Sequence, residues 1–193
     1  TQSSTLVPDD RSDVSFISPS AMQLVPSGYT SDFFVEDWVG LELPQKNLCL
    51  MPINDCDHND ENMEGPGGTH WGLLIYYRPT NTFRMYDTMG GSLRSQCRAA
   101  IKELAATFHA EDAKFEVEIH TPRQENSYDC GAYSCSIAAD LIKCYLQHER
   151  LLNKDELAAI TLPIVMDRRQ ALYKVARRDP QVRGGTAAEI WII

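Results

Sequence analysis

The most informative part of the sequence is QENSYDCGAY, residues 124–133. Before it, residues 115–120 alternate between apolar and polar side chains, which predicts a strand that ends before Pro122. After it, apolar side chains recur at helical spacing, at Tyr133, Ile137, Leu141 and Cys144. We therefore expect Cys130 at the start of a helix, with Asp129 as its N-cap.

That position favours a reactive thiol. Free backbone N–H groups at a helix N-terminus stabilise negative charge and lower the pKa of a cysteine, and the thiolate is the reactive form. Gly131 has no side chain, so a substrate carbonyl group could approach Cys130 closely. A lone cysteine is more often a buried core residue, so the interpretation depends on the residues around it.

Length and composition predict one domain. The 193 residues are 43% hydrophobic and 23% charged, as in ordinary globular proteins. We expect a flexible N-terminal tail over 1–11, a domain over 12–178 and a C-terminal tail of uncertain order over 179–193. No apolar run has the length of a membrane helix and no signal-peptide pattern is present, so we expect a cytoplasmic or nuclear protein, not one at a membrane.

Charge and residue spacing exclude several kinds of partner. The net charge of −9 argues against binding to nucleic acid and favours a partner with a basic face. The six cysteines include no Cys-x-x-Cys pair, and the histidines are not at zinc-ligand spacing. The acidic loop over 55–68 resembles a calcium loop, but Asp60 replaces the required glycine and Pro66 the required glutamate. We expect reduced thiols, no metal, no cofactor and a monomer.

A predicted hairpin brings two polar residues together. Residues 71–77 and 82–87 read as strands joined by a short turn at 78–81. The outer ends of such a hairpin meet, which places His70 near Asp87. A further buried strand is expected over 48–53, and Pro52 argues that the strand ends there. Helices are expected over 21–25, 33–41, 92–108 (capped by Ser92), from Lys154 (capped by Asn153) and over 161–177.

These residues suggest a cysteine protease. Such an enzyme needs a base, an acceptor that orients the base, and donors for the oxyanion. His70 and Asp87 could supply the first two, and Gln124 and the Cys130 N–H the donors, Gln124 being six residues before Cys130. His109 and His120 compete with His70 as bases. Taken singly, each of these residues could be ordinary surface or turn polarity.

Three blocks resemble the Ulp/sentrin family of cysteine proteases, which act on ubiquitin-like proteins. They are GTHWGLL at 68–74, Tyr86 with Asp87, and QENSYDCG at 124–131. Segments 13–19, 43–46 and 53–55 leading to 67–71 are most similar to the branch that removes the neddylation modifier. The resemblance runs from about residue 12 to about residue 146.

The resemblance implies an α+β, papain-like (adenain/Ulp-type) cysteine protease fold, a mixed sheet flanked by helices with the nucleophile at a helix N-terminus. It implies that His70 is the general base, Asp87 its orienter, Cys130 the nucleophile and Gln124 the oxyanion donor. It also implies that Trp71 roofs a narrow channel for the Gly-Gly tail of the modifier, although a strand tryptophan could equally be core. The expected reaction is cleavage after that tail, both in the modifier precursor and in conjugates such as neddylated cullins.

One departure from the family pattern concerns the N-terminal side. Family members carry a Trp-Leu-Asn-Asp motif there, and none of Trp38, Trp71 and Trp191 is followed by it. We therefore expect a chain that is short at its N-terminus. Two alternatives stay open: a family protease that acts on SUMO or ubiquitin, and a protein that binds the modifier without cleaving it.

Overall fold

The computed structural model describes residues 13–25, 41–56 and 68–178. Both predicted tails, at 1–11 and 179–193, lie outside the described residues, as do most of the predicted helix over 33–41 and most of the acidic loop over 55–68. The domain limits therefore stay a prediction.

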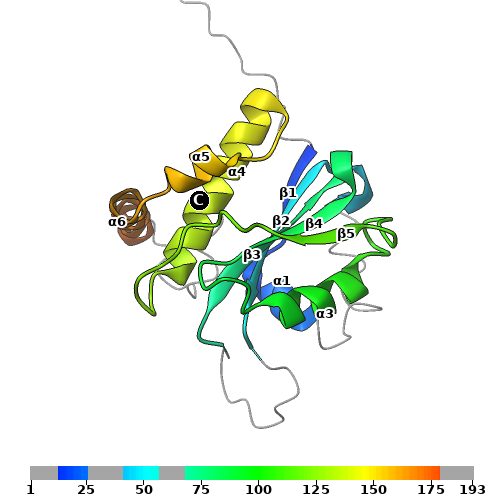
Figure 1. Cartoon of the computed structure of the whole chain (residues 1–193), viewed down its shortest axis with the longest axis horizontal. Helices are drawn as coiled ribbons and strands as arrows, with labels where there is room; N and C mark the ends of the chain where they lie inside the picture. Colours follow the sequence, from blue (N-terminus) through cyan, green and yellow to red (C-terminus); the bar gives the residue numbers. More distant parts are fainter. Residues whose placement is uncertain (1–12, 26–40, 57–67, 179–193) are drawn as a thin grey trace, which may run out of the picture.

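The fold is built on a mixed sheet of five strands in the order β1-β2-β3-β4-β5 (Figure 1). The strands span Val14–Phe16, Leu48–Asn54, Trp71–Tyr77, Thr82–Tyr86 and Lys114–Val117. The two outer pairs, β1 with β2 and β4 with β5, are parallel, while β3 pairs antiparallel with β2 and β4. The strand β3 is therefore central, and its first residue follows His70 directly.

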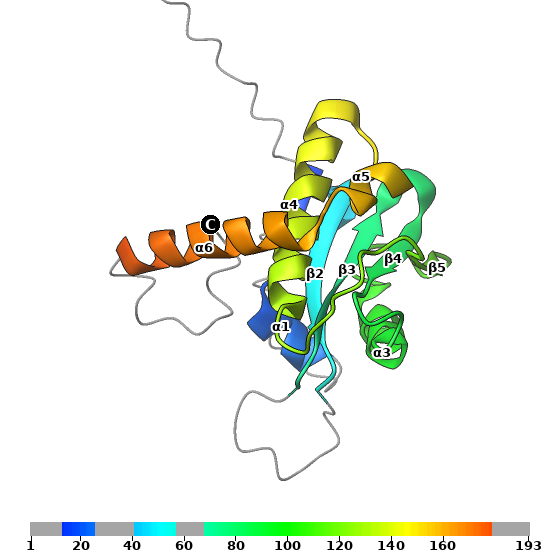
Figure 2. The ribbon, with the colours of Figure 1, turned by 60° about the vertical axis from the view of Figure 1, so that its left-hand side comes forward.

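Helices cover both faces of the sheet, because successive side chains of a strand point to opposite faces. The helices are α1 (Pro19–Leu24), α3 (Arg94–Leu104), α4 (Cys130–His148), α5 (Lys154–Ala158) and α6 (Leu162–Arg178). Leu74 and Tyr76 of β3 pack in one core with α1 and α3, while Leu73 and Ile75 pack in a second core with α4. Figure 2 shows α3 and α4 on opposite sides of the sheet. No helix in the described ranges is long and apolar enough to cross a membrane.

The predicted hairpin is confirmed, but the strand before it is longer than predicted. β2 continues two residues past Pro52 and pairs with β3 as far as Asn54 opposite Trp71. The Ile17 N–H donates to the Leu50 carbonyl group at 2.9 Å, so the backbone nitrogen two residues later, in Pro52, faces the same side. Because β1 ends at Phe16, it offers no carbonyl group to accept a hydrogen bond from position 52. The strand therefore tolerates proline, which has no N–H.

The described helices lie where the sequence predicts them, but one of the predicted N-cap residues does not cap its helix. Ser18 caps α1, and Asn153 caps α5 in a capping box with Glu156. The prediction that Ser92 caps α3 is wrong, because its hydroxyl group donates to Asp87 instead. The strand predicted to reach His120 ends at Val117, after which Glu118 begins a turn.

Candidate active site

The hairpin holds His70 and Asp87 together. β3 begins one residue after His70 and β4 ends one residue before Asp87, so antiparallel pairing brings the two side chains to one edge of the sheet. His70 Nε2 lies 2.7 Å from Asp87 Oδ1, and both residues are buried. The predicted proximity is confirmed. An imidazole with one nitrogen held by a carboxylate has a fixed ring orientation.

The Asp87 carboxylate is held on both oxygens by the turn that follows it. Oδ1 also accepts from the Met89 N–H at 2.8 Å. Oδ2 accepts from the Gly91 and Leu93 N–H groups at 2.8 and 3.2 Å, and from the Ser92 hydroxyl at 3.0 Å. Burial opposes ionisation, but these bonds and that from His70 outweigh it and hold the pKa of Asp87 well below its usual range. Asp87 is therefore a charged acceptor at neutral pH.

The backbone at His70 is anchored by a second carboxylate, that of Asp55. Asp55 Oδ1 accepts from the N–H groups of Thr69 and His70 at 2.5 and 2.8 Å, and Oδ2 from the Thr69 hydroxyl at 2.9 Å. The Asp55 N–H in turn donates to the His70 carbonyl at 3.1 Å. Burial favours the protonated acid, but these hydrogen bonds outweigh it and lower the pKa of Asp55. His70 is thus held at its ring by Asp87 and at its backbone by Asp55.

Cys130 is the first residue of α4, as predicted, and is 5% exposed. Burial raises the pKa of its thiol, but bonding to His70 and to the backbone N–H groups of Trp71 and Gly131 more than offsets this, so the pKa falls below its usual value. Burial instead raises the pKa of Cys49 and of Cys135 to about 12. Cys130 therefore differs in chemistry from its neighbour Cys135 on the same helix.

The pKa of His70 is raised to about 9. Burial disfavours the charged imidazole, but the hydrogen bond with Asp87 and the interaction with Cys130 favour it more strongly. Nε2 is taken by Asp87, and Nδ1 is buried with no well-aligned hydrogen-bond partner among the described residues. Nδ1 is therefore the ring nitrogen left for Cys130, at looser geometry than a standard hydrogen bond. Such loose pairs are common in unliganded enzymes. An imidazolium and thiolate pair is the state these shifts favour.

Gln124 lies on the loop that leads to Cys130 and is fixed at both ends of its amide. Its Oε1 accepts from the Thr88 hydroxyl at 2.6 Å, and its Nε2 donates to the Asn126 carbonyl at 2.6 Å. Thr88 follows Asp87 directly, so the Gln124 amide is tied to the same turn that holds Asp87. Among the described residues, Asn126 is the one acceptor bonded to Nε2, so its second N–H is available to another oxygen atom.

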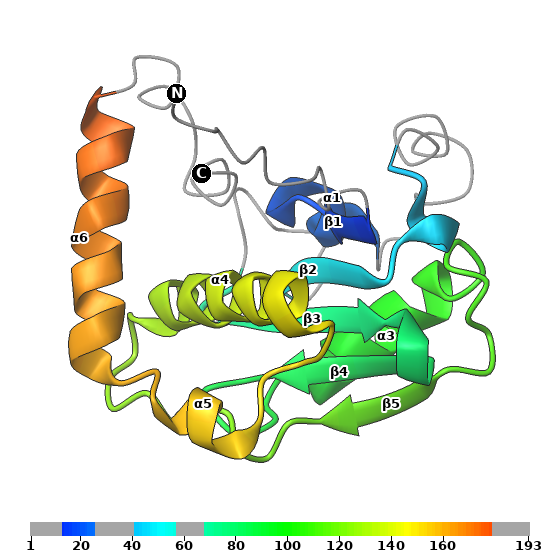
Figure 3. The same cartoon turned by 90° about the horizontal axis from the view of Figure 1, so that it is seen from above.

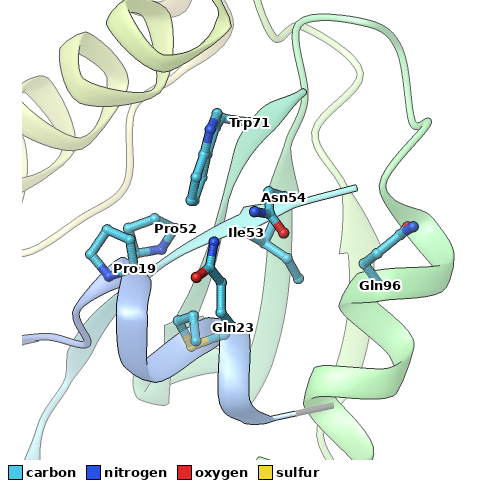
Figure 4. Close-up of a pocket in the computed structure, with 8 residues that line it drawn as sticks. Pro19, Gln23, Pro52, Ile53, Asn54, Trp71 and Gln96 are labelled. Atoms are coloured by element: carbon cyan, nitrogen blue, oxygen red, sulfur yellow. The ribbon is translucent and has the colours of Figure 1, made fainter. Parts of the chain in front are cut away.

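Gly131 and Trp71 border Cys130. A Cβ atom added at Gly131 would meet no other atom within 4 Å, so the space beside Cys130 is open. The Trp71 indole lies over Pro52 at one side of a small pocket, with amide side chains around it (Figure 4). The other residues that line this pocket are Pro19, Met22, Gln23, Ile53, Asn54 and Gln96.

The competing bases are not brought to this site. Both His109 and His120 are exposed. His109 follows α3 with a positive φ of 52°, and its N–H donates to the Ala106 carbonyl. The His120 N–H donates to the Glu118 carboxylate beyond β5. Within the described ranges no group of three His, Cys, Asp or Glu side chains could hold a metal ion.

Asp129 is the N-cap residue of α4, as predicted, but its carboxylate makes no capping hydrogen bond to the helix. Oδ2 accepts from Asn126 Nδ2 at 2.7 Å, and Oδ1 pairs with Arg169 of α6. An ion pair and a side-chain amide outcompete the cap because the carboxylate is buried, where a charge needs strong partners.

Comparison with known proteins agrees with this arrangement. Residues 36–166, more than half of the chain, match the family described as "Ulp1 protease family, C-terminal catalytic domain". The chain belongs to the Ulp1 protease family. Membership confirms the resemblance seen in the sequence and the predicted papain-like fold, in which a mixed sheet is flanked by helices and the candidate nucleophile begins a helix.

Several family members are similar over only part of their length. NEDD8-specific protease 1 of Arabidopsis thaliana is 30% identical over 145 residues, 75% of this chain and 62% of the relative. Sentrin-specific protease 8 of Homo sapiens is 35% identical over 121 residues, 62% of this chain and 55% of the relative. The chain thus spans less than two thirds of these relatives. The solved C-terminal Ulp1 protease domain in complex with Smt3, the yeast ortholog of SUMO, is 20% identical with a TM-score of 0.47, over 75% of this chain and 63% of that one.

Three residues of the site escaped the sequence interpretation. The sequence interpretation did not single out Thr88, and it placed Asp55 in the acidic loop. The role of Asp55 follows from the register that places Asn54 opposite Trp71, which a strand pattern alone does not specify. No signal in the sequence links Arg169 to Asp129, 40 residues before it.

Proposed function

We propose that this chain is a cysteine protease that cleaves after the C-terminal Gly-Gly of the modifier NEDD8. The observation that carries the chemistry is the pairing of a low-pKa thiol at a helix N-terminus with a carboxylate-held imidazole. Choice of the modifier is supported by the NEDD8-specific name of a relative 30% identical to this chain. The substrates would be the NEDD8 precursor and its conjugates, such as neddylated cullins.

In the proposed reaction, the Cys130 thiolate attacks the carbonyl carbon of the terminal glycine. The negative charge that develops on the carbonyl oxygen receives hydrogen bonds from Gln124 Nε2 and the Cys130 N–H. As the tetrahedral intermediate collapses, the C–N bond breaks and His70 gives its proton to the leaving amine. Water, deprotonated by His70, then attacks the thioester and releases the modifier and free Cys130. Asp87 keeps His70 oriented and favours its protonated form throughout.

Selectivity for a Gly-Gly tail fits the surroundings of Cys130. The open space at Gly131 leaves room for a carbonyl group, and an indole such as that of Trp71 would admit only residues without side chains beneath it. We propose these two residues as the substrate-binding pair.

The test is covalent labelling with NEDD8, SUMO and ubiquitin that each carry a C-terminal thiol-reactive group. Wild type, Cys130→Ala and Cys135→Ala are compared, since Cys135 lies on the same helix but has a raised pKa. We expect NEDD8 to label wild type and Cys135→Ala, and not Cys130→Ala. Labelling by SUMO or ubiquitin alone would overturn the choice of modifier. Binding of NEDD8 without labelling would overturn the activity and indicate a non-catalytic binder.

A further inference from the structure

An ion pair joins α6 to the residue that precedes the candidate nucleophile. Arg169 Nη1 lies 2.5 Å from Asp129 Oδ1, and the Asp129 side chain is only 2% exposed. Figure 3 shows α6 crossing close to the N-terminal end of α4. Arg169 lies beyond residue 166, where the family match ends. Within the described ranges it is the one cation that a salt bridge joins to Asp129.

Asp129 links this ion pair to the loop that carries the oxyanion donor. Its second oxygen accepts from Asn126 Nδ2, and Asn126 Oδ1 accepts from the N–H groups of Tyr128 and Asp129 at 3.1 and 3.0 Å. The Asn126 carbonyl accepts from Gln124 Nε2. Asn126 therefore connects the Asp129 carboxylate to Gln124 through hydrogen bonds within this loop.

A buried carboxylate beside a thiolate has an electrostatic cost. Like charges close together in a poorly solvated place favour the protonated thiol and raise its pKa. Arg169 lies where it offsets the charge of Asp129. Charged groups on the described segments around Cys130 also include His70 before β3, Asp87 after β4, and the exposed Glu125 on the same loop.

The neighbouring Arg168 makes a similar contact that does not reach the loop. Its Nη1 and Nη2 lie 2.9 and 2.8 Å from the two oxygens of Asp140, and Nη1 also donates to the Ser136 carbonyl at 3.1 Å. Both partners are on α4, within or beyond its second turn. The side chains of Arg168 and Arg169 are similarly exposed, at 36% and 31%. The two arginines therefore share the docking of α6 onto α4 and differ in contact with Asp129.

We propose that Arg169 is a positioning residue for Cys130, which acts through Asp129 by neutralising its carboxylate and holding the loop from Gln124 to Cys130. The proposal rests on Cys130 being the nucleophile, as proposed above, and does not depend on which modifier is cleaved. Among the described residues, the side-chain contacts of Arg169 are with Asp129 and Tyr173, and none is with Cys130 or His70. Its effect reaches the thiol by charge and by loop geometry.

The test is the pH dependence of Cys130 alkylation by iodoacetamide, followed by mass spectrometry of the peptide that contains Cys130. This readout needs no substrate, so it remains informative if the proposed modifier is wrong. We expect Arg169→Gln to raise the apparent pKa of Cys130 by about one unit and to slow alkylation about tenfold below that pKa. Arg168→Gln should leave the pKa unchanged, although it too removes an ion pair between α6 and α4.

Two further variants separate charge from folding. Asp129→Asn leaves the Arg169 cation unopposed, so the pKa should fall below that of wild type. The double variant Asp129→Asn/Arg169→Gln replaces the ion pair by two amides that can bond to each other, and its pKa should return to that of wild type. Equal pKa values in Arg169→Gln, Arg168→Gln and wild type would overturn the proposal. If Arg169→Gln does not fold, an unchanged pKa in Asp129→Asn would overturn it as well.

Discussion

The His70 ring and the Asp87 carboxylate meet at 2.7 Å although 17 residues separate them along the chain. A single hairpin accounts for this, since His70 directly precedes β3 and Asp87 directly follows β4. The turn after β4 then folds back to donate three backbone N–H groups and one hydroxyl to the same carboxylate. The turn therefore fixes the Asp87 carboxylate in the position from which it orients His70.

Asp87→Asn should lower kcat by about 10² to 10⁴-fold. An amide can present either its oxygen or its NH₂ group to His70, so it does not hold one ring orientation, and it carries no charge to stabilise the imidazolium. The matched control is Ser92→Ala, which removes one bond to the carboxylate and leaves the His70 contact in place. We expect Ser92→Ala to retain most activity. Steady-state hydrolysis of a fluorogenic modifier substrate measures both, and full activity in Asp87→Asn would contradict the role of Asp87.

The pH dependence of kcat/KM should have an alkaline limit near pH 9. The pKa of His70 is raised to about 9, so above that pH the imidazole loses the proton needed by the leaving amine. Towards low pH the Cys130 thiolate is protonated, and the lowered pKa of this thiol moves that acid limit below the pH expected for an ordinary cysteine. NMR titration of His70 in wild type and Cys130→Ala would measure the shift. A midpoint near 6.5 in wild type would refute it.

The same titration bears on stability. Because the folded-state pKa of His70 exceeds its usual value of 6.5, its charged form stabilises the folded protein fully below pH 6.5. That contribution decreases as pH rises through 6.5 and is lost above about 9. Urea unfolding at pH 6 and pH 9.5 should therefore show a lower free energy of unfolding at the higher pH, and the difference should shrink in His70→Ala.

Gln124→Ala should reduce kcat by about 10² to 10³-fold with a small effect on KM, since it removes a donor to charge that develops only in the transition state. Thr88→Val removes the hydroxyl that holds the Gln124 amide at Oε1 and leaves the amide itself present. Its loss should be smaller than that of Gln124→Ala. Unchanged kcat in Gln124→Ala would mean that the second oxyanion donor lies elsewhere.

Asp55→Ala should lower kcat by about 10- to 100-fold, because three hydrogen bonds that place the backbone of Thr69 and His70 are lost and the imidazole shifts. Asp55→Asn retains an oxygen that can accept from the His70 N–H and should lose less. Thermal unfolding of both variants separates misplacement from loss of fold. Equal activity in Asp55→Ala and wild type would show that Asp87 alone positions His70.

Much of the candidate site could be predicted because its residues belong to elements that are neighbours along the chain. His70 and Asp87 flank two strands joined by a short turn, and antiparallel pairing of such neighbours leaves one arrangement of their outer ends. Cys130 begins a helix because apolar residues recur at helical spacing directly after it. In both cases the residues that determine the arrangement are close in sequence, so their pattern predicts the local structure.

From the sequence one can predict the candidate catalytic residues, the hairpin that pairs two of them, and the helix that begins at the third. How each of these residues is held depends on the packing of the whole chain. The Asp129 carboxylate makes no capping bond to α4 because Arg169, brought by the packing of α6, offers a stronger partner to a buried charge. Pro52 stays inside β2 because β1 has already ended. In both cases the deciding segment is distant along the chain: α6 supplies a cation to a buried carboxylate, and the end of β1 leaves no hydrogen bond for position 52 to donate.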